Sequence, residues 1–136
     1  MKSRILASLD HIEEEEQVRI FYACESGSRA WGFASKDSDY HVRFLYVHHP
    51  NWYLSVDLEH KRDVIERPIV ERLDVNGWDL RKALLLLRSS NPPLLEWLGS
   101  PIVYRDQYDI VDVVRKLVPE AYSPVACLHH YLHMAQ

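Results

Sequence analysis

The spacing of apolar residues along the chain changes from a helical period to a strand-like one and back again. Ile5, Leu9 and Ile12 recur at helical spacing, which predicts an amphipathic helix over residues 3–17. Residues 18–24 are a continuous apolar run rich in branched and aromatic side chains, which is typical of a buried strand. The chain is therefore expected to begin with a helix that leads directly into a core strand.

The middle of the chain has the pattern of three more strands. Residues 39–47 predict the second strand, with its apolar side chains in one phase. Residues 62–69 and 70–75 predict two further strands, joined as a hairpin around Pro68. The dipeptide Asn76-Gly77 is expected to break the last of them, because it is a strong turn signal.

Helical patterns dominate the second half of the chain. Pro92-Pro93 and Ser123-Pro124 are first-turn and cap signals for two of these helices. The predicted helices cover residues 78–88, 92–98, 106–118 and 124 to the C-terminus, and residues 100–104 form an extended linker or edge strand. The last helix has no stop signal, which indicates that a longer chain has been shortened here.

Length and composition are those of one ordinary globular domain. The 136 residues can bury a real core, and the chain is 47% hydrophobic and 26% charged. A net charge of -4 gives no bulk attraction to nucleic acid or to a membrane. The two cysteines, Cys24 and Cys127, form no metal-binding pattern, and no apolar run is long enough to span a membrane. We therefore expect a reduced, cytoplasmic setting and no membrane partner.

The segment from Gly27 to Phe44 carries the candidate chemistry. Gly27-Ser28 is a small, flexible turn, and Asp37, Asp39 and His41 follow at alternate positions. These three side chains would share one face if the strand already begins at Asp37, because alternate strand residues point the same way. A turn that holds phosphate beside carboxylates on a strand is what a metal-dependent phosphoryl or nucleotidyl transfer site requires. Ser28 can cap a short helix over residues 29–33. A plain strand-to-helix turn is the alternative for Gly27-Ser28 alone.

A third acid is available further along the chain. Asp74 would join the other acids if its strand lies beside the second strand. Mg²⁺ prefers oxygen ligands and is usually shared between one or two carboxylates and substrate phosphates, so such a group could hold it. Two such ions can activate an attacking hydroxyl and stabilise the leaving pyrophosphate.

These motifs resemble a known signature. Gly27-Ser28 followed by Asp39-Tyr40-His41-Val42 is similar to the Gly-Ser and Asp-x-Asp signature of the polymerase-β-type nucleotidyltransferase superfamily. Longer blocks resemble the predicted nucleotidyltransferases of the YcgL/RlaP type, an RNA-ligase-associated family. These blocks are ESGSRAWGFASKDSDY, VRFLYV, LDVNGWDLRKALLLL, SNPPLLEWLGSPIVY and HHYLHMAQ, so the resemblance runs from about residue 20 to the end.

The resemblance implies a fold and a reaction. The fold is an α+β nucleotidyltransferase fold, in which a small mixed β-sheet packs against helices and a helical part follows. We expect one domain over residues 1–136, with a sheet-containing catalytic part over about 1–78 and a helical part over about 79–136. The implied reaction is the Mg²⁺- or Mn²⁺-dependent transfer of a nucleotide from an NTP to a hydroxyl, on RNA or on a protein.

The resemblance also assigns roles to residues. Gly27 and Ser28 would hold the triphosphate, Asp39 would be the first metal ligand, and position 41 would be the second. Asp74 would be the third ligand and would activate the acceptor hydroxyl. Arg29 and Arg43 are near enough in sequence to assist phosphate binding, although Arg29 could equally be a surface charge. Asp79 also looks characteristic of the family, and we interpret it as structural because it begins a predicted helix.

Position 41 departs from the family, where an aspartate is expected. A neutral imidazole is a poor Mg²⁺ ligand and brings no negative charge. Three interpretations follow: an inactive member that still binds nucleotide, a metal shared by Asp37 and Asp39 instead, or a residue altered on purpose. The first hypothesis for function is thus a nucleotidyltransferase weakened by His41. The alternatives are a catalytically degenerate nucleotide-binding or protein-interaction module, and a fragment that needs further helices.

Overall fold

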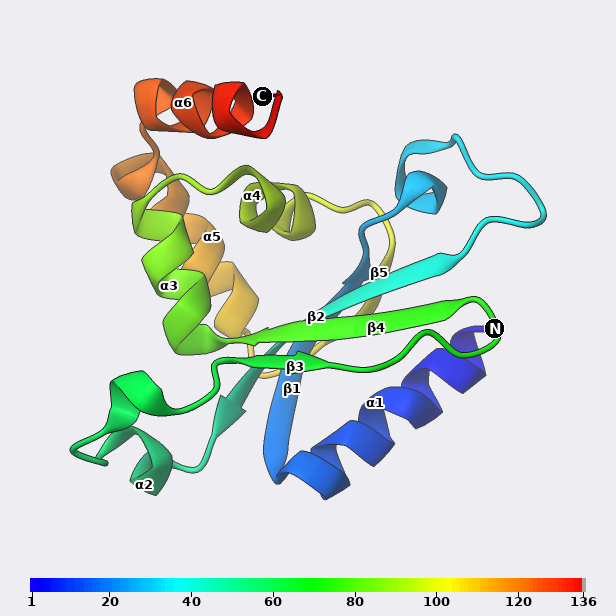
Figure 1. Cartoon of the computed structure of the whole chain (residues 1–136), viewed down its shortest axis with the longest axis horizontal. Coiled ribbons are helices and arrows are strands. Elements are labelled where there is room, and N and C mark those ends of the chain that lie inside the picture. Colours follow the sequence, from blue (N-terminus) through cyan, green and yellow to red (C-terminus); the bar gives the residue numbers. More distant parts are fainter. Residues whose placement is uncertain (136) are drawn as a thin grey trace.

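The computed structural model describes residues 1–135, and in them one five-stranded sheet lies between the N-terminal helix and a group of helices from the second half of the chain (Figure 1). The strands are β1 (Val18–Glu25), β2 (Tyr40–His48), β3 (Val64–Glu66), β4 (Leu73–Asp79) and β5 (Val103–Asp106). The α-helices are α1 (Lys2–Glu16), α2 (Pro50–Tyr53), α3 (Leu80–Arg88), α4 (Pro92–Leu98), α5 (Ile110–Ala121) and α6 (Pro124–Ala135). Two short 3-10 turns are η1 (Ser28–Trp31) and η2 (Leu58–His60).

The sheet is mixed, as expected. Its strand order is β3-β4-β2-β1-β5, and β2 and β4 run parallel while every other neighbouring pair is antiparallel. β5 returns from the helical second half of the chain to the edge of the sheet beside β1. The predicted α+β class is therefore confirmed.

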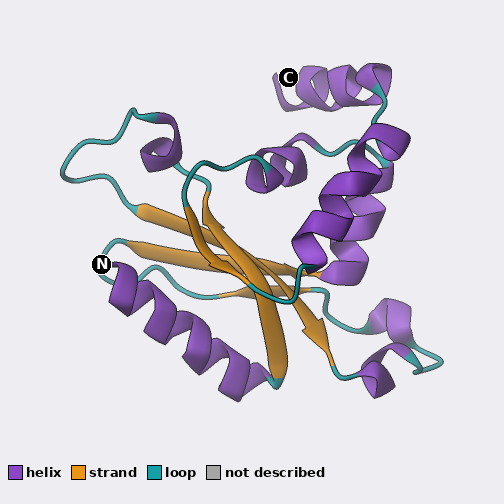
Figure 2. Cartoon of the chain, turned by 180° about the vertical axis from the view of Figure 1, so that it is seen from behind, coloured by secondary structure: helices purple, strands orange, loops and turns teal. Residues whose placement is uncertain are grey.

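Each face of the sheet has its own core (Figure 2). Ile5, Leu9 and Ile12 of α1 are buried against one face, and this confirms the predicted apolar side of that helix. The opposite face is covered by α3, α4 and α5, where the indole rings of Trp78 and Trp97 stack with centroids 3.8 Å apart. α6 lies outside this layer, next to α4 (Figure 1).

Most predicted elements are present, but Asn76-Gly77 is not a break. β4 runs through both residues to Asp79, and α3 begins at Leu80. A Cβ added to Gly77 would come within 2.2 Å of Cε2 of Phe44, so the glycine allows a buried ring on the neighbouring strand to pack against the backbone. Asn76 uses its side chain within the sheet, because its Oδ1 accepts a hydrogen bond from the N–H of Arg67 at 3.2 Å.

Two local expectations are wrong. Residues 70–72 are not strand: Glu71 and Arg72 have φ of 48° and 67°, and they form the turn that leads into β4. Ser28 does not cap a helix with its side chain, because η1 has Gly27 at the cap position and no side-chain cap hydrogen bond. None of the helices in residues 1–135 is both long and apolar enough to cross a membrane.

Candidate functional site

A buried glutamate fixes the turn at the end of β1. Glu25 is fully buried, and its Oε2 accepts hydrogen bonds from the N–H of Gly27 at 3.0 Å and from the N–H of His41 at 2.9 Å. The hydroxyl of Tyr104, on β5, donates to the other oxygen at 2.9 Å. One carboxylate therefore joins the Gly27-Ser28 turn to β2 and to the edge strand. We did not predict this role, and the only signal for it was an acidic residue at the end of an apolar run.

The turn lies directly against the side chain of His41. A Cβ added to Gly27 would come within 2.4 Å of Cδ2 of His41, so only glycine leaves room for the imidazole here. The N–H of Ser26 donates to the His41 carbonyl at 2.9 Å, which holds the backbone of the turn on β2. The turn therefore lies beside the first residues of β2, which Asp39 directly precedes.

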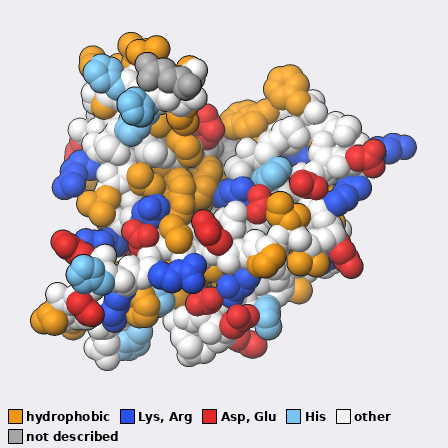
Figure 3. Space-filling view, viewed as in Figure 1, with side chains coloured by type: hydrophobic (Ala, Val, Ile, Leu, Met, Phe, Trp, Pro, Cys, Tyr) orange, Lys and Arg blue, Asp and Glu red, His pale blue; other side chains and the backbone are white. Residues whose placement is uncertain are grey.

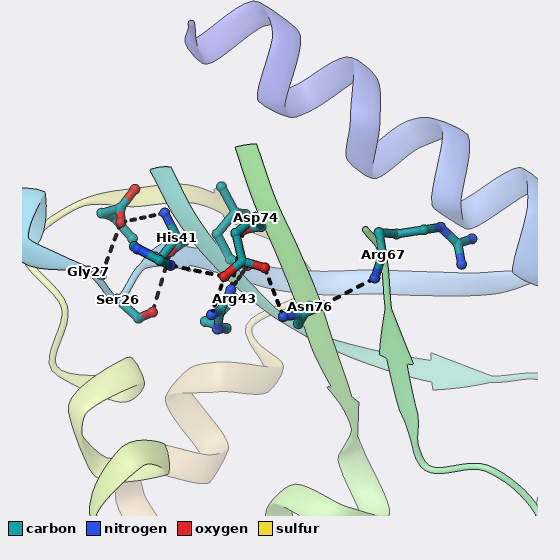
Figure 4. Close-up of polar contacts among 9 residues, drawn as sticks. Ser26, Gly27, His41, Arg43, Arg67, Asp74 and Asn76 are labelled. Carbon is teal, nitrogen blue, oxygen red and sulfur yellow. Dashed lines mark hydrogen bonds and ion pairs between the residues drawn. The ribbon is translucent and has the colours of Figure 1, made fainter. Parts of the chain in front are cut away.

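The parallel pairing of β2 and β4 places Asp74 opposite His41 (Figure 4). Nδ1 of His41 lies 2.9 Å from Oδ2 of Asp74, and Nη2 of Arg43 donates to the same oxygen at 2.8 Å. The strand of Asp74 thus lies beside the second strand, as required for a third acid. Arg43 was expected to assist phosphate binding, and in the structure its guanidinium contacts Asp74.

The other oxygen of Asp74 also has a partner. Asn76 Nδ2 donates to Oδ1 at 3.0 Å (Figure 4). Burial raises the pKa of the Asp74 carboxyl, but the hydrogen bonds and positive charge of Arg43, together with those of His41, outweigh burial and hold this pKa below its usual value. Asp74 is therefore a carboxylate whose charge is balanced by neighbouring side chains.

This arrangement does not fit the divalent cation that the resemblance implies. The two oxygens of an ionised carboxylate offer about four lone-pair positions, and Asp74 already uses two at Oδ2 and one at Oδ1, which leaves little room for a cation. Nδ1 of His41 is used as well, and the guanidinium of Arg43 brings positive charge to the same place. Within residues 1–135 no group of three or more His, Cys, Asp or Glu side chains is placed to hold a metal ion.

The remaining predicted acids, Asp37 and Asp39, lie in the loop that leads into β2. Asp39 is half-buried and directly precedes the strand. Asp37 lies in a turn before it, not in the strand, and its side chain is 98% exposed, 3.8 Å from Nη1 of Arg72. The structure therefore does not place Asp37 on the strand face with His41.

Arg29 is held within its own loop. Its Nη2 donates to the Ser38 carbonyl at 2.7 Å, and its guanidinium lies 3.9 Å from the centroid of the Tyr40 ring. Its Nε is buried without a hydrogen-bond partner among the described residues. The side chain thus fastens the loop to the start of β2.

Asp79 has the structural role that we expected. It is the N-cap of α3, and its Oδ1 accepts a hydrogen bond from the N–H of Arg81 at 2.8 Å. The Tyr53 hydroxyl lies 3.1 Å from both of its oxygens. Burial raises the pKa of the Asp79 carboxyl, and the hydrogen bonds from Arg81 and Tyr53, which lower this pKa, offset the effect of burial only in part.

Comparison with known proteins identifies the family of the chain. A family model described as RlaP, an RNA repair pathway DNA polymerase beta family, matches residues 1–136. The chain belongs to this family. It is 54% identical over 136 residues to a protein of Bacillus subtilis (strain 168) that carries the name "Uncharacterized protein YcgL". The match covers 100% of this chain and 52% of that protein, so the chain spans about half the length of its relative. No solved structure matches the chain.

Proposed function

We propose that this member of the RlaP family is a nucleotidyltransferase domain that holds an NTP at the Gly27-Ser28 turn, and that His41 weakens nucleotide transfer. One observation supports this most strongly: the glycine turn, the start of β2 and the third acid on β4 come together at one end of the sheet. The family match supports the reaction class.

The residues around the turn have separate tasks in this proposal. Gly27 and Ser28 approach the triphosphate closely, and Glu25 holds the turn in place from behind. Asp39 and Asp74 provide the carboxylates of the site. In this chain Arg43 and His41 contact the Asp74 carboxylate, so Asp74 is not free to serve as the third acid that transfer demands.

We further propose a hydroxyl on RNA as the acceptor, because the family description names an RNA repair pathway. A protein hydroxyl is the alternative acceptor.

A second candidate function is a nucleotide-binding module without turnover. It is favoured by the three N–H donors that already form hydrogen bonds to the Asp74 carboxylate. In that case the carboxylate would stabilise the fold and balance charge, and it would take no part in transfer. The two candidates differ in what happens when position 41 becomes acidic.

The test is a transfer assay with the four α-³²P-labelled NTPs, Mg²⁺ or Mn²⁺, and an RNA oligonucleotide that ends in a 3′-hydroxyl. The unsubstituted chain is compared with His41→Asp, and His41→Asp/Asp39→Ala is the matched control. We expect label on the RNA with His41→Asp, at least about tenfold less with the unsubstituted chain, and none with the control. The same oligonucleotide with a 3′-phosphate should receive no label. If His41→Asp labels nothing while still binding NTP, the non-catalytic module is correct.

A further inference from the structure

Two large aromatic side chains stand exposed beside the candidate site. Trp31 is 48% exposed and Phe33 is 83% exposed, and neither belongs to either core cluster. Figure 1 places their segment at the upper right, next to the start of β2, and Figure 3 shows hydrophobic side chains exposed there in the same view. Single exposed aromatics are ordinary, but here two large aromatic side chains are exposed within three residues of one short turn.

Backbone hydrogen bonds fix both residues relative to the turn that would hold phosphate. The carbonyl of Ser28 accepts hydrogen bonds from the N–H of Gly32 and from the N–H of Phe33, the latter at 3.0 Å. Gly32 has a φ of 80° with open space where a Cβ would be, so the chain reverses here without strain. The position of Trp31 and Phe33 relative to Gly27-Ser28 is therefore set by the fold.

The far side of the same loop is also anchored. Arg29 packs on the Tyr40 ring and donates to the Ser38 carbonyl, which ties the beginning of the loop to its end. The loop can therefore present its aromatic rings without ordering on binding, and a preformed surface loses less free energy when a ligand arrives.

We propose that Trp31 and Phe33 form a stacking surface for the base of the NTP held at Gly27-Ser28. The inference rests on the proposed function, because a ribose joins the base to the phosphates and so keeps the base close to the turn. A base has an apolar aromatic face, and stacking on an aromatic side chain tolerates any base. The affinity for an NTP should therefore increase with the stacking area of its base, so that purine NTPs bind more tightly than pyrimidine NTPs.

The experiment is calorimetric titration of ATP, CTP and inorganic tripolyphosphate into four proteins. They are the unsubstituted chain, Trp31→Ala, Phe33→Ala and Tyr122→Ala. Tyr122 is the matched control, because it is 44% exposed and lies between α5 and α6, away from the turn. Trp31→Phe is added because it keeps an aromatic ring at the position, and a thermal melt of each variant checks that the fold is retained.

The proposal predicts that the unsubstituted chain binds ATP more tightly than CTP, and CTP more tightly than tripolyphosphate. Trp31→Ala and Phe33→Ala should each weaken ATP binding by about 5- to 100-fold. Tripolyphosphate binding should stay within about twofold in every variant, and Trp31→Phe should retain most of the ATP affinity.

Two results would overturn the stacking surface and leave the phosphate site standing. One is equal affinity of the unsubstituted chain for ATP and tripolyphosphate. The other is a loss of ATP affinity in Tyr122→Ala as large as in Trp31→Ala. If neither ATP nor tripolyphosphate binds the unsubstituted chain, the proposed function and this inference both fail.

Discussion

Asp74 and Asp79 lie at opposite ends of one strand, β4, and both are buried, at 8% and 2% exposure. Their partners differ in kind. Asp74 contacts the guanidinium of Arg43 and the imidazole of His41 on the neighbouring strand β2, whereas Asp79 accepts hydrogen bonds from a backbone N–H and a tyrosine hydroxyl. Their pKa values move in opposite directions from the same usual value, downward for Asp74 and upward for Asp79.

The comparison shows that two buried acids on one strand can be stabilised in different ways. A helix cap and a hydroxyl satisfy a carboxylate without charged partners, so Asp79 can be buried inside the fold. Asp74 instead sits in an electrostatic cluster at the end of the sheet that carries the glycine turn. The two acids should therefore respond differently to substitution.

The largest expected effect is on stability, from Asp79→Ala. It removes the cap of α3 and leaves the Tyr53 hydroxyl without its acceptor, so the free energy of unfolding should fall by about 2–4 kcal/mol. Urea denaturation measures this. Asp79→Asn keeps a capping side chain and should lose much less, and NTP binding should be unchanged in both folded variants. Equal losses for alanine and asparagine would contradict the capping role.

Asp74→Ala should cost less stability. Arg43 and His41 would lose their anionic partner, but their side chains are 18% and 36% exposed, so water can solvate part of the charge. We expect the free energy of unfolding to fall by about 1–2 kcal/mol in the same urea experiment. Asp74→Asn is the control that keeps the shape. A loss equal to that of Asp79→Ala would mean that Asp74 is a structural acid as well.

The smallest effect is in the pH dependence, and its sign differs between the two acids. The Asp74 contribution is fully present above its unfolded pKa near 3.8 and is lost as pH falls through its lower folded pKa. Ionised Asp79 costs stability above its raised folded pKa, and that cost disappears as pH falls through this pKa toward 3.8.

Unfolding free energies of the unsubstituted chain, Asp74→Asn and Asp79→Asn between pH 3 and 7 measure this contrast. The stability advantage of the unsubstituted chain over Asp74→Asn should shrink as the pH falls. Relative to Asp79→Asn, the unsubstituted chain should gain stability as the pH falls through the raised folded pKa of Asp79, which lies above 3.8. Profiles that change in the same direction would show that the two carboxyl groups have equivalent surroundings.

The sequence predicted the elements that have strong periodicity. The α1 face and the core strand β1 were correct because apolar spacing decides them. Asn76-Gly77 misled the prediction because tertiary packing of Phe44 on Gly77 overrides a local turn signal. Alternation alone could not decide whether Asp37 belongs to the strand, because it does not locate the first strand residue.

The sequence indicated which residues belong to the candidate site, but it did not predict the contacts between them. The pairing of Asp74 with position 41 required the parallel register of β2 and β4, which no local pattern gives. Glu25 was missed because its partners are backbone N–H groups and a distant tyrosine. The contacts of Arg43 and His41 with Asp74 likewise depend on the three-dimensional fold, and no local sequence pattern predicts them.

The most direct test is calorimetric binding of ATP, with and without Mg²⁺, to the unsubstituted chain and to His41→Asp. An aspartate at position 41 would face Asp74 across the strands, and two opposed carboxylates favour a shared cation. We predict that Mg²⁺ tightens ATP binding to His41→Asp by about tenfold or more and changes binding to the unsubstituted chain by less than about twofold. No ATP binding to either protein, or the same Mg²⁺ dependence in both, would contradict the account.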